Sequence, residues 1–338
     1  MLKRAAYGLL VAVALYAPSW AADIWYQDSN LGRAGGVPAD FVEKFRKPET
    51  FAQATRHIRV YMIRSNVAGK LDDAFFTDLF FPYLQRNNIK LAINTGGATW
   101  AQADDRRRRV FDNSIDVLHR MKRLGGKVDY ISLQSILSKP NRRGEAEYPM
   151  DKRIQDAVAY GKAAREVFPG VAIGLIDALP SHGKDYRGPY RVLRDALDQA
   201  GIGLSYVHLD MPFEIPATER RGITWQSVRM LEGYVEDELG LPFGLFMVSR
   251  RAGQHSSRMV YERTLSFLDC YAGLGGTPRD YVVTSFFRYP ERTIPEIATG
   301  DDYPQMRTML AFGRRLDEIR RTGVGPSGAW RGQCRISR

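Results

Sequence analysis

The chain has 338 residues, of which 44% are hydrophobic and 26% charged. This composition is typical of an ordinary globular protein and excludes an intrinsically disordered chain. The length fits one large domain or two ordinary ones. The formal net charge is +11, from 49 basic and 38 acidic residues, which indicates either a diffuse basic surface or an anionic partner.

The first 21 residues have the pattern of a secretory signal peptide. Lys3 and Arg4 make a basic start, an apolar run covers residues 5–17, and a small-residue site ends at Ala21. We expect cleavage after Ala21 and a mature protein that is periplasmic or secreted from a bacterium. The apolar run is shorter than the roughly 20 residues of a membrane span, so we do not expect a protein embedded in the membrane.

Removal of this segment leaves 47 basic and 38 acidic residues, a net charge of +9. Nucleic acid is not an expected partner outside the cytoplasm. An anionic polysaccharide or the cell envelope is the more plausible partner for a basic exported protein.

Eight short apolar runs rich in β-forming residues follow along the chain, and amphipathic stretches with helical spacing separate them. We predict strands at residues 23–28, 57–65, 89–95, 128–135, 171–178, 204–211, 241–249 and 280–288. The stretch 39–56 is the least regular, and Pro48 predicts two short helices within it. The last amphipathic stretch, residues 305–321, predicts a closing helix.

A strand followed by a helix, repeated eight times, predicts an α/β protein with a closed (β/α)8 barrel. The barrel is expected to form a single domain over residues 22–322, with a C-terminal tail at 323–338. A doubly wound open sheet is the main alternative, but the chain has no G-x-G-x-x-G fingerprint.

The carboxyl ends of all strands in a parallel barrel meet at one rim, where active sites form. Asp177 ends the fifth predicted strand, and Asp210 and Glu214 follow the sixth. Paired carboxylates are the machinery of glycoside hydrolysis, and their separation decides between retention and inversion. We therefore take Asp177, Asp210 and Glu214 as candidate catalytic residues, with Asp210 as nucleophile or base and Asp177 or Glu214 as general acid.

Other polar and aromatic residues near the strand ends are candidates for substrate binding. His208 shares a strand face with Asp210, and Trp100 offers an aromatic plane to a sugar ring from a loop. The full set of substrate-binding candidates is Asp28, Asn94, Trp100, Gln134, His208, Arg250, Arg288 and Tyr289.

A structural interpretation of the same residues stays open. An aspartate at a strand end commonly caps the next helix or pairs with an arginine, and a histidine such as His208 is commonly hydrogen-bonded in the core. The chain has no G-x-S-x-G, H-E-x-x-H or P-loop motif and no metal-spaced histidine pair. We expect no metal and no cofactor.

Two cysteines are present, Cys270 in a predicted helix and Cys334 in the tail. Export makes a disulfide between them permissible. Such a bond would hold the tail against the body of the protein.

The layout resembles that of secreted bacterial TIM-barrel proteins of the glycoside hydrolase type. The segments DIWYQDSN, VAIGLIDALP, LSYVHLDMPFE and LPFGLFMVS carry the resemblance. The large retaining clan of such barrels has an Asn-Glu pair after strand 4 and a Glu after strand 7. Here strand 4 ends in SLQS and strand 7 in MVSR, so no catalytic residue can be carried over from that clan.

The resemblance implies a barrel that acts on an extracellular or envelope polysaccharide through its rim carboxylates. Because this chain lacks the clan's catalytic residues, a non-catalytic carbohydrate-binding barrel is the main alternative. An envelope scaffold that presents the barrel to a protein partner is a third interpretation. The sequence does not choose among them.

Overall fold

The computed structural model describes residues 22–29, 36–96, 98, 105–137, 148–179, 185–322 and 334, without the side chains of 105–107. The predicted signal peptide and most of the predicted tail lie outside these residues. In the part of the chain that is described, no helix is long and apolar enough to span a membrane.

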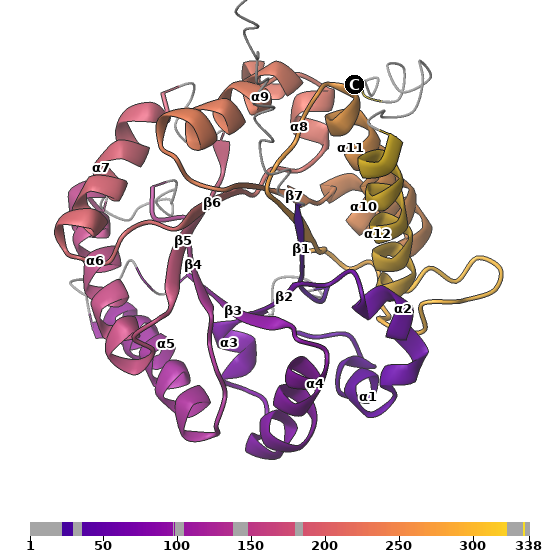
Figure 1. The fold of residues 1–338 in the computed structure, drawn as a ribbon, viewed down its shortest axis with the longest axis horizontal. Helices are drawn as coiled ribbons and strands as arrows, with labels where there is room; N and C mark the ends of the chain where they lie inside the picture. The colour runs from indigo at the N-terminus through magenta and orange to yellow at the C-terminus, as the bar shows by residue number, and fades with distance from the viewer. Residues whose placement is uncertain are drawn as a thin grey trace, which may run out of the picture.

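Eight parallel strands close into a barrel in sequence order, and the first strand pairs with both the second and the eighth (Figure 1). This arrangement confirms the predicted (β/α)8 fold. The strands are β1 (Asp23–Tyr26), β2 (Val60–Arg64), β3 (Lys90–Thr95), β4 (Tyr130–Gln134), β5 (Ala172–Asp177), β6 (Tyr206–Leu209), β7 (Phe243–Met247) and β8 (Asp280–Val283).

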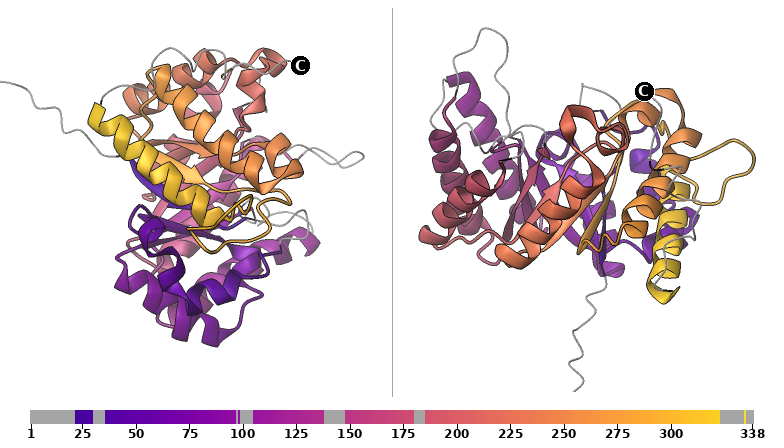
Figure 2. Two further views of the ribbon diagram at one scale, coloured as in Figure 1. Left: turned by 90° about the vertical axis from the view of Figure 1, so that its right-hand side faces the viewer. Right: turned by 90° about the horizontal axis from the view of Figure 1, so that it is seen from above.

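Helices surround the strands as an outer ring, and the side views in Figure 2 show them running along the barrel. They are α1 (Phe41–Arg46), α2 (Ala52–Thr55), α3 (Ser65–Ala68), α4 (Phe81–Arg86), α5 (Asp105–Arg123), α6 (Met150–Val167), α7 (Arg187–Gln199), α8 (Glu214–Ala217), α9 (Trp225–Gly233), α10 (Arg250–His255), α11 (Ser257–Gly273) and α12 (Gln305–Thr322). Two π-helical segments, Phe75–Phe80 and Tyr234–Glu238, adjoin α4 and α9. The predicted break at Pro48 is present, because a 3-10 turn that starts at this residue separates α1 from α2.

All eight predicted strands exist, and the largest difference from prediction is at the end of β8. We predicted this strand to residue 288, but it ends at Val283. The chain beyond it leaves the sheet and packs on α10. There Tyr289 donates its backbone N–H to the carbonyl of Gly253 at 2.9 Å, and Phe287 lies so close that a Cβ on Gly253 would be 2.7 Å from it.

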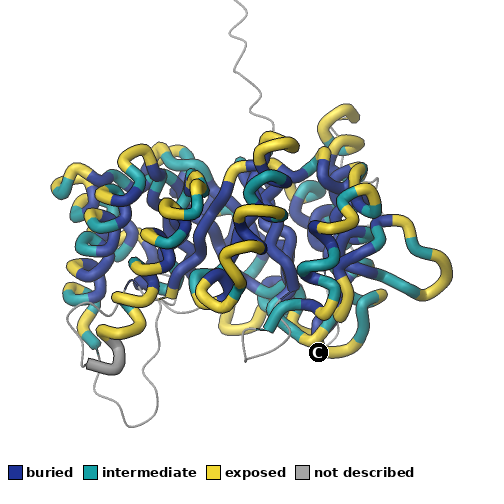
Figure 3. The backbone as a smooth tube through the Cα atoms, turned by 90° about the horizontal axis from the view of Figure 1, so that it is seen from below, coloured by how far each residue is buried: buried dark blue, intermediate teal, exposed yellow. Residues whose placement is uncertain are grey.

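Side chains fill the barrel interior. Apolar residues from seven of the strands or their ends form this inner cluster: Trp25, Val60, Met62, Ala92, Ile176, Tyr206, Phe246, Val248 and Val282. Two glycines make room for its rings, because a Cβ on Gly174 would lie 2.2 Å from Tyr206 and a Cβ on Gly244 would lie 2.3 Å from His208. The alternate residues of each strand face the helices and form the larger outer core, and the strands are accordingly the most buried part of the chain (Figure 3).

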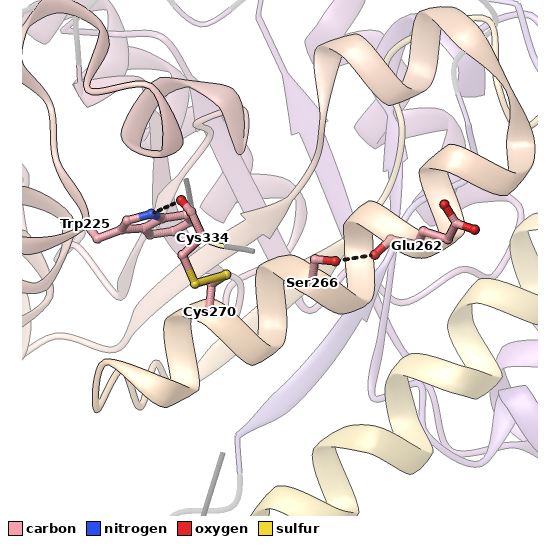
Figure 4. The surroundings of a disulfide bond; sticks show 5 residues. All are labelled: Trp225, Glu262, Ser266, Cys270 and Cys334. Carbon is pink, nitrogen blue, oxygen red and sulfur yellow. Dashed lines mark hydrogen bonds between the residues drawn. A yellow bond between two sulfur atoms is a disulfide. The ribbon is translucent and has the colours of Figure 1, made fainter. Parts of the chain in front are cut away.

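A disulfide joins Cys270 of α11 to Cys334, with a Cα–Cα distance of 5.5 Å (Figure 4). The indole N–H of Trp225 donates to the carbonyl of Cys334 at 3.1 Å. The disulfide that the sequence left open is therefore present, and it holds Cys334 between α9 and α11.

Candidate active site at the carboxyl end of the barrel

The side-chain face of β6 decides which rim residues point inward. Tyr206 belongs to the inner cluster, and the His208 ring lies 4.6 Å from the ring of Trp25 inside the barrel. Asp210 follows two residues later and continues the same face. Its carboxyl group therefore lies at the mouth of the barrel, above the packed interior.

Asp210 has an electrostatic environment that favours its protonated form. Burial raises the pKa of Asp210 to about 6, the neighbouring Asp177 carboxylate adds to the increase, and the charge of Arg64 opposes it. Arg64 ends β2, and its guanidinium carbon lies 5.1 Å from the centre of the Phe286 ring. A carboxylic acid with this pKa can hold a proton in weakly acidic solution, as a general acid must.

Three buried polar side chains at the carboxyl ends of β1, β3 and β8 have atoms without hydrogen-bond partners in the described part of the protein. In Asn94, which is 2% exposed, both the nitrogen and the oxygen of the amide lack a partner among the described residues. So do Gln27 Oε1 and Thr284 Oγ1. Since leaving a buried polar group unpaired costs about 1–3 kcal/mol, such groups at a barrel mouth are typical of a site built to bind a polar ligand.

Asp177 lies next to Asp210 but on the other side-chain face. Its strand neighbour Ile176 belongs to the inner cluster, so alternation directs Asp177 toward the helices. There burial, followed by the charge of Asp177 and a hydrogen bond to it, raises the pKa of Tyr190 on α7. The backbone N–H of Asp210 donates to the carbonyl of Asp177 at 2.8 Å. The structure thus brings the two aspartates together at the rim, with different directions.

Asp28 does not face the mouth as an available ligand. Its Oδ1 pairs with the fully buried ammonium of Lys44 at 2.5 Å and accepts the Tyr26 hydroxyl at 2.9 Å. Its other oxygen accepts the hydroxyl of Tyr61. The predicted role of Asp28 in substrate binding is therefore replaced by a structural one between β1 and α1.

Glu214 is also occupied by the protein. Its carboxylate accepts the backbone N–H groups of Arg250 and Arg251, at 3.1 and 3.0 Å, and the hydroxyl of Ser249. These donors form the first turn of α10, where a carboxylate satisfies unpaired N–H groups and complements the helix dipole. Glu214 thus caps a helix, and this geometry gives no support to its predicted catalytic role.

His208 is a core residue and not a substrate-binding one. It is fully buried, and its Nε2 lies 2.9 Å from Oδ2 of Asp280, which begins β8 at the other end of the barrel. The structural interpretation of this histidine is the correct one.

The remaining substrate-binding candidates lie in different parts of the structure, and only some of them are at the mouth of the barrel. Gln134 shares the inward face of Ser132, whose hydroxyl bonds Tyr206 inside the barrel, so its position at the mouth agrees with the prediction. Arg250 and Arg288 are exposed, and Arg288 pairs with Glu291 at 2.8 Å. Tyr289 lies on the segment that packs on α10. Trp100 lies outside the described residues.

Thr284 and Phe286 were not among the predicted site residues. They follow Val282 at steps of two residues, and this spacing within the predicted strand was the signal that could have found them. Although the strand ends at Val283, Phe286 packs against the inner cluster. Among the described residues, no group of three or more histidines, cysteines or carboxylates is arranged to hold a metal ion.

Solved structures of glycoside hydrolases have the same fold. They include xylanase 10C from Cellvibrio japonicus, with 10% identity and a TM-score of 0.51 over 94% of this chain and 75% of that one. Xylanase A of P. fluorescens subsp. cellulosa, in complex with xylopentaose, has 10% identity and a TM-score of 0.51 over 86% and 97%. A fungal β-1,4-galactanase has 10% identity and a TM-score of 0.50 over 87% and 100%.

No protein-family model and no curated protein sequence matches this chain. The likeness to the hydrolases, at 10% identity, is one of fold. The chain is a single-domain (β/α)8 barrel.

Proposed function

We propose that this protein is a glycoside hydrolase that acts on a polysaccharide at the carboxyl end of the barrel, with Asp210 as the general acid. The observation that carries the proposal is the inward-facing carboxyl group of Asp210, whose pKa is raised to about 6. The unpaired amide of Asn94 and the inward position of Gln134 support it, since amides bind sugar hydroxyls well.

The raised pKa reverses the role that the sequence suggested for Asp210. In the proposed reaction the Asp210 carboxyl donates its proton to the glycosidic oxygen as the bond to the sugar breaks. Asp177, which points outward at the adjacent strand end, raises the pKa of Asp210 and so helps to keep this acid protonated before the transfer. A water molecule then adds to the sugar and returns a proton to Asp210, which restores the enzyme.

Arg64 has two effects in this scheme. Its charge lowers the pKa of Asp210, and it places a cation at the mouth of a barrel whose chain, without residues 1–21, has 47 basic and 38 acidic residues, a net charge of +9. We propose that acidic polysaccharides are among the substrates on these grounds. Export to the periplasm or the medium, as the first 21 residues predict, would place the enzyme where such polymers occur.

The test is hydrolysis of a panel of neutral and acidic polysaccharides, followed as the release of reducing ends at pH 5.5. Loss of a general acid typically costs 10²–10⁴-fold, so we expect Asp210→Asn to lower the rate roughly 100-fold or more. Asp177→Asn should also lower it. Asp195→Asn is the matched control, because Asp195 is exposed and pairs with Arg194 on the outside of α7.

If Asp177→Asn and Asp210→Asn both cleave as fast as the parent, the assignment of the catalytic residues is wrong. If the parent protein neither cleaves nor binds any glycan, the proposed function itself fails.

The second candidate function is non-catalytic carbohydrate binding. It is favoured by the structural use of Asp28 and Glu214, which leaves Asp177 on the outward face as the only predicted partner for Asp210. A glycan array combined with the reducing-end assay separates the two functions. Glycan affinity that Asn94→Ala weakens, without any release of reducing ends, would identify a binding protein.

A further inference from the structure

A cavity of about 580 Å³ lies at the end of the barrel opposite to Asp210, where the strands begin. Its walls come from the first residues of β1, the turn between α2 and β2, and the second half of α12. The proposed mechanism uses none of these residues.

Four arginines and only two carboxylates line this cavity: Arg56, Arg59, Arg314 and Arg320 with Asp23 and Asp317. The Arg59 guanidinium lies 4.0 Å from Asp23, and that of Arg320 lies 3.2 Å from Asp317. The carboxylates therefore neutralise at most half of the arginine charge.

Neutral acceptors hold two of the arginines in place. Arg314 donates to the side-chain oxygen of Gln53 at 2.6 Å, and Arg320 donates to the backbone carbonyl of Ala22. Arg56 is exposed and forms no ion pair with any described carboxylate. A guanidinium that is positioned by a neutral oxygen keeps its full charge, so the cavity is a pre-organised cluster of cations.

His57 lies in the wall of the cavity, near Arg314, Arg320 and the carboxylate of Asp317. Its ring packs against α12 at Gly313, where a Cβ would lie 2.3 Å from it. Burial lowers the pKa of His57, the charges of Arg314 and Arg320 lower it further, and Asp317 opposes them. The imidazole is therefore an uncharged hydrogen-bonding group at neutral pH. Its Nδ1 lies 3.4 Å from Oδ2 of Asp317.

We propose that this cavity binds a phosphoryl group through Arg56, Arg59, Arg314 and Arg320. Guanidinium groups are planar donors that match phosphate oxygens two at a time, and four of them line this cavity, two from the turn between α2 and β2 and two from α12. The phosphoryl group can come from a soluble phosphate or from the headgroup of an anionic phospholipid. The site does not depend on the proposed glycan chemistry.

Ala22, which lines the cavity, is the first residue after the predicted cleavage site. Cleavage there would place the new terminal ammonium beside the arginines and would add one more cation. Binding is therefore best measured on the mature chain, residues 22–338.

The test compares three versions of that chain: the parent, the double variant Arg56→Gln/Arg314→Gln, and the control Arg108→Gln/Arg109→Gln. All four arginines are exposed, so all three proteins are expected to fold, which circular dichroism checks. The control removes the same charge from α5, outside the cavity. Binding of inorganic phosphate is measured by calorimetry, and binding of vesicles of phosphatidylglycerol or phosphatidylcholine by co-sedimentation.

We expect the cavity variant to bind phosphate at least tenfold more weakly than the parent and the control to stay within twofold of it. Phosphate binding without vesicle binding supports a soluble ligand. Binding to phosphatidylglycerol but not to phosphatidylcholine, lost only in the cavity variant, supports a lipid headgroup. The proposal is overturned if the parent binds neither probe, or if the control loses as much affinity as the cavity variant.

Discussion

Asp28 and Asp210 each follow a strand of the same barrel. Asp28 follows β1, and Asp210 follows β6. Asp28 has an ammonium and two hydroxyl groups on its two oxygens. Asp210 has the opposing charge of Arg64 but also a second carboxylate nearby, and its pKa rises to about 6. The same residue type is therefore a fully partnered structural group on one side and a titrating acid on the other.

The difference shows that the surroundings of a carboxylate determine what it can do. A fully partnered, buried anion such as Asp28 stabilises the fold only while its partners remain. A carboxyl group with few partners, such as Asp210, costs stability when it ionises, and this cost is what makes it useful as an acid. Four experiments test the contrast, from the largest expected effect to the smallest.

Removal of the cation beside Asp28 should have the largest effect. Lys44→Met leaves a buried carboxylate without its counter-ion, and breaking a buried pair in this way typically costs about 3–5 kcal/mol of unfolding free energy. Denaturant unfolding followed by circular dichroism measures the change. Lys47→Met is the control on the neighbouring turn, because Lys47 is 56% exposed where it pairs with Glu43, and it should cost less than about 1 kcal/mol. Equal losses in the two variants would contradict the structural role of the Asp28 pair.

Removal of the charge of Asp210 should change the free energy of unfolding in the opposite direction, by increasing it at neutral pH. The pKa of Asp210 rises from 3.8 to about 6 on folding. The free energy of unfolding of the parent protein therefore decreases as the pH increases through this window, and it stays lower at higher pH. We expect Asp210→Asn to be more stable than the parent at pH 7.5, by up to about 2 kcal/mol after allowance for solvent screening. The two proteins should differ little at pH 3.5, and thermal unfolding at both pH values measures this. A variant that is less stable at pH 7.5 would refute the environment described for Asp210.

Loss of the cap on α10 should be a smaller effect. Glu214→Ala removes the acceptor of two backbone N–H groups, and loss of a cap typically costs about 0.5–2 kcal/mol. The measurement is again the unfolding free energy, with Glu262→Ala, an exposed residue of α11 that pairs with Arg258, as the control. A change in the pH dependence of glycan cleavage, without a change in the free energy of unfolding, would show that Glu214 has a catalytic role.

The smallest effect is a shift of the pH profile. The charge of Arg64 lowers the pKa of Asp210, so Arg64→Gln should raise this pKa. Because the proposed acid must be protonated, activity falls as the pH increases through its pKa, and the alkaline limb should move to higher pH in the variant. The rate of reducing-end release between pH 4 and 9 measures the limb. A limb that moves to lower pH would show that Arg64 does not act on Asp210.

The barrel could be predicted because its strands are short, apolar and regularly separated by amphipathic stretches. Eight strands followed by helices leave few topologies, and the structure has the predicted one. The disulfide could be anticipated as possible for a different reason, since Cys270 and Cys334 are the only cysteines of a chain whose first 21 residues predict export.

The use of the rim carboxylates could not be predicted in the same way. Lys44, the partner of Asp28, lies 16 residues away on a short helix, and no local pattern indicates that its ammonium is buried. Glu214 caps α10, a helix of six residues that is too short to show a hydrophobic period. Asp177 and Asp210 end adjacent strands, but a shift of one residue exchanges the two faces of a strand, and only coordinates show that they point in different directions.

The bond between Cys270 and Cys334 spans 64 residues of sequence, and β8 and α12 both lie within that span. β8 is the strand that completes the circle with β1, so the closing unit of the barrel belongs to a covalent ring. Fraying from the carboxyl terminus would have to stop at Cys334 as long as the bond is oxidised. The cross-link keeps β8 and α12 tethered to α11 even when they detach, which limits the access of proteases to the seam.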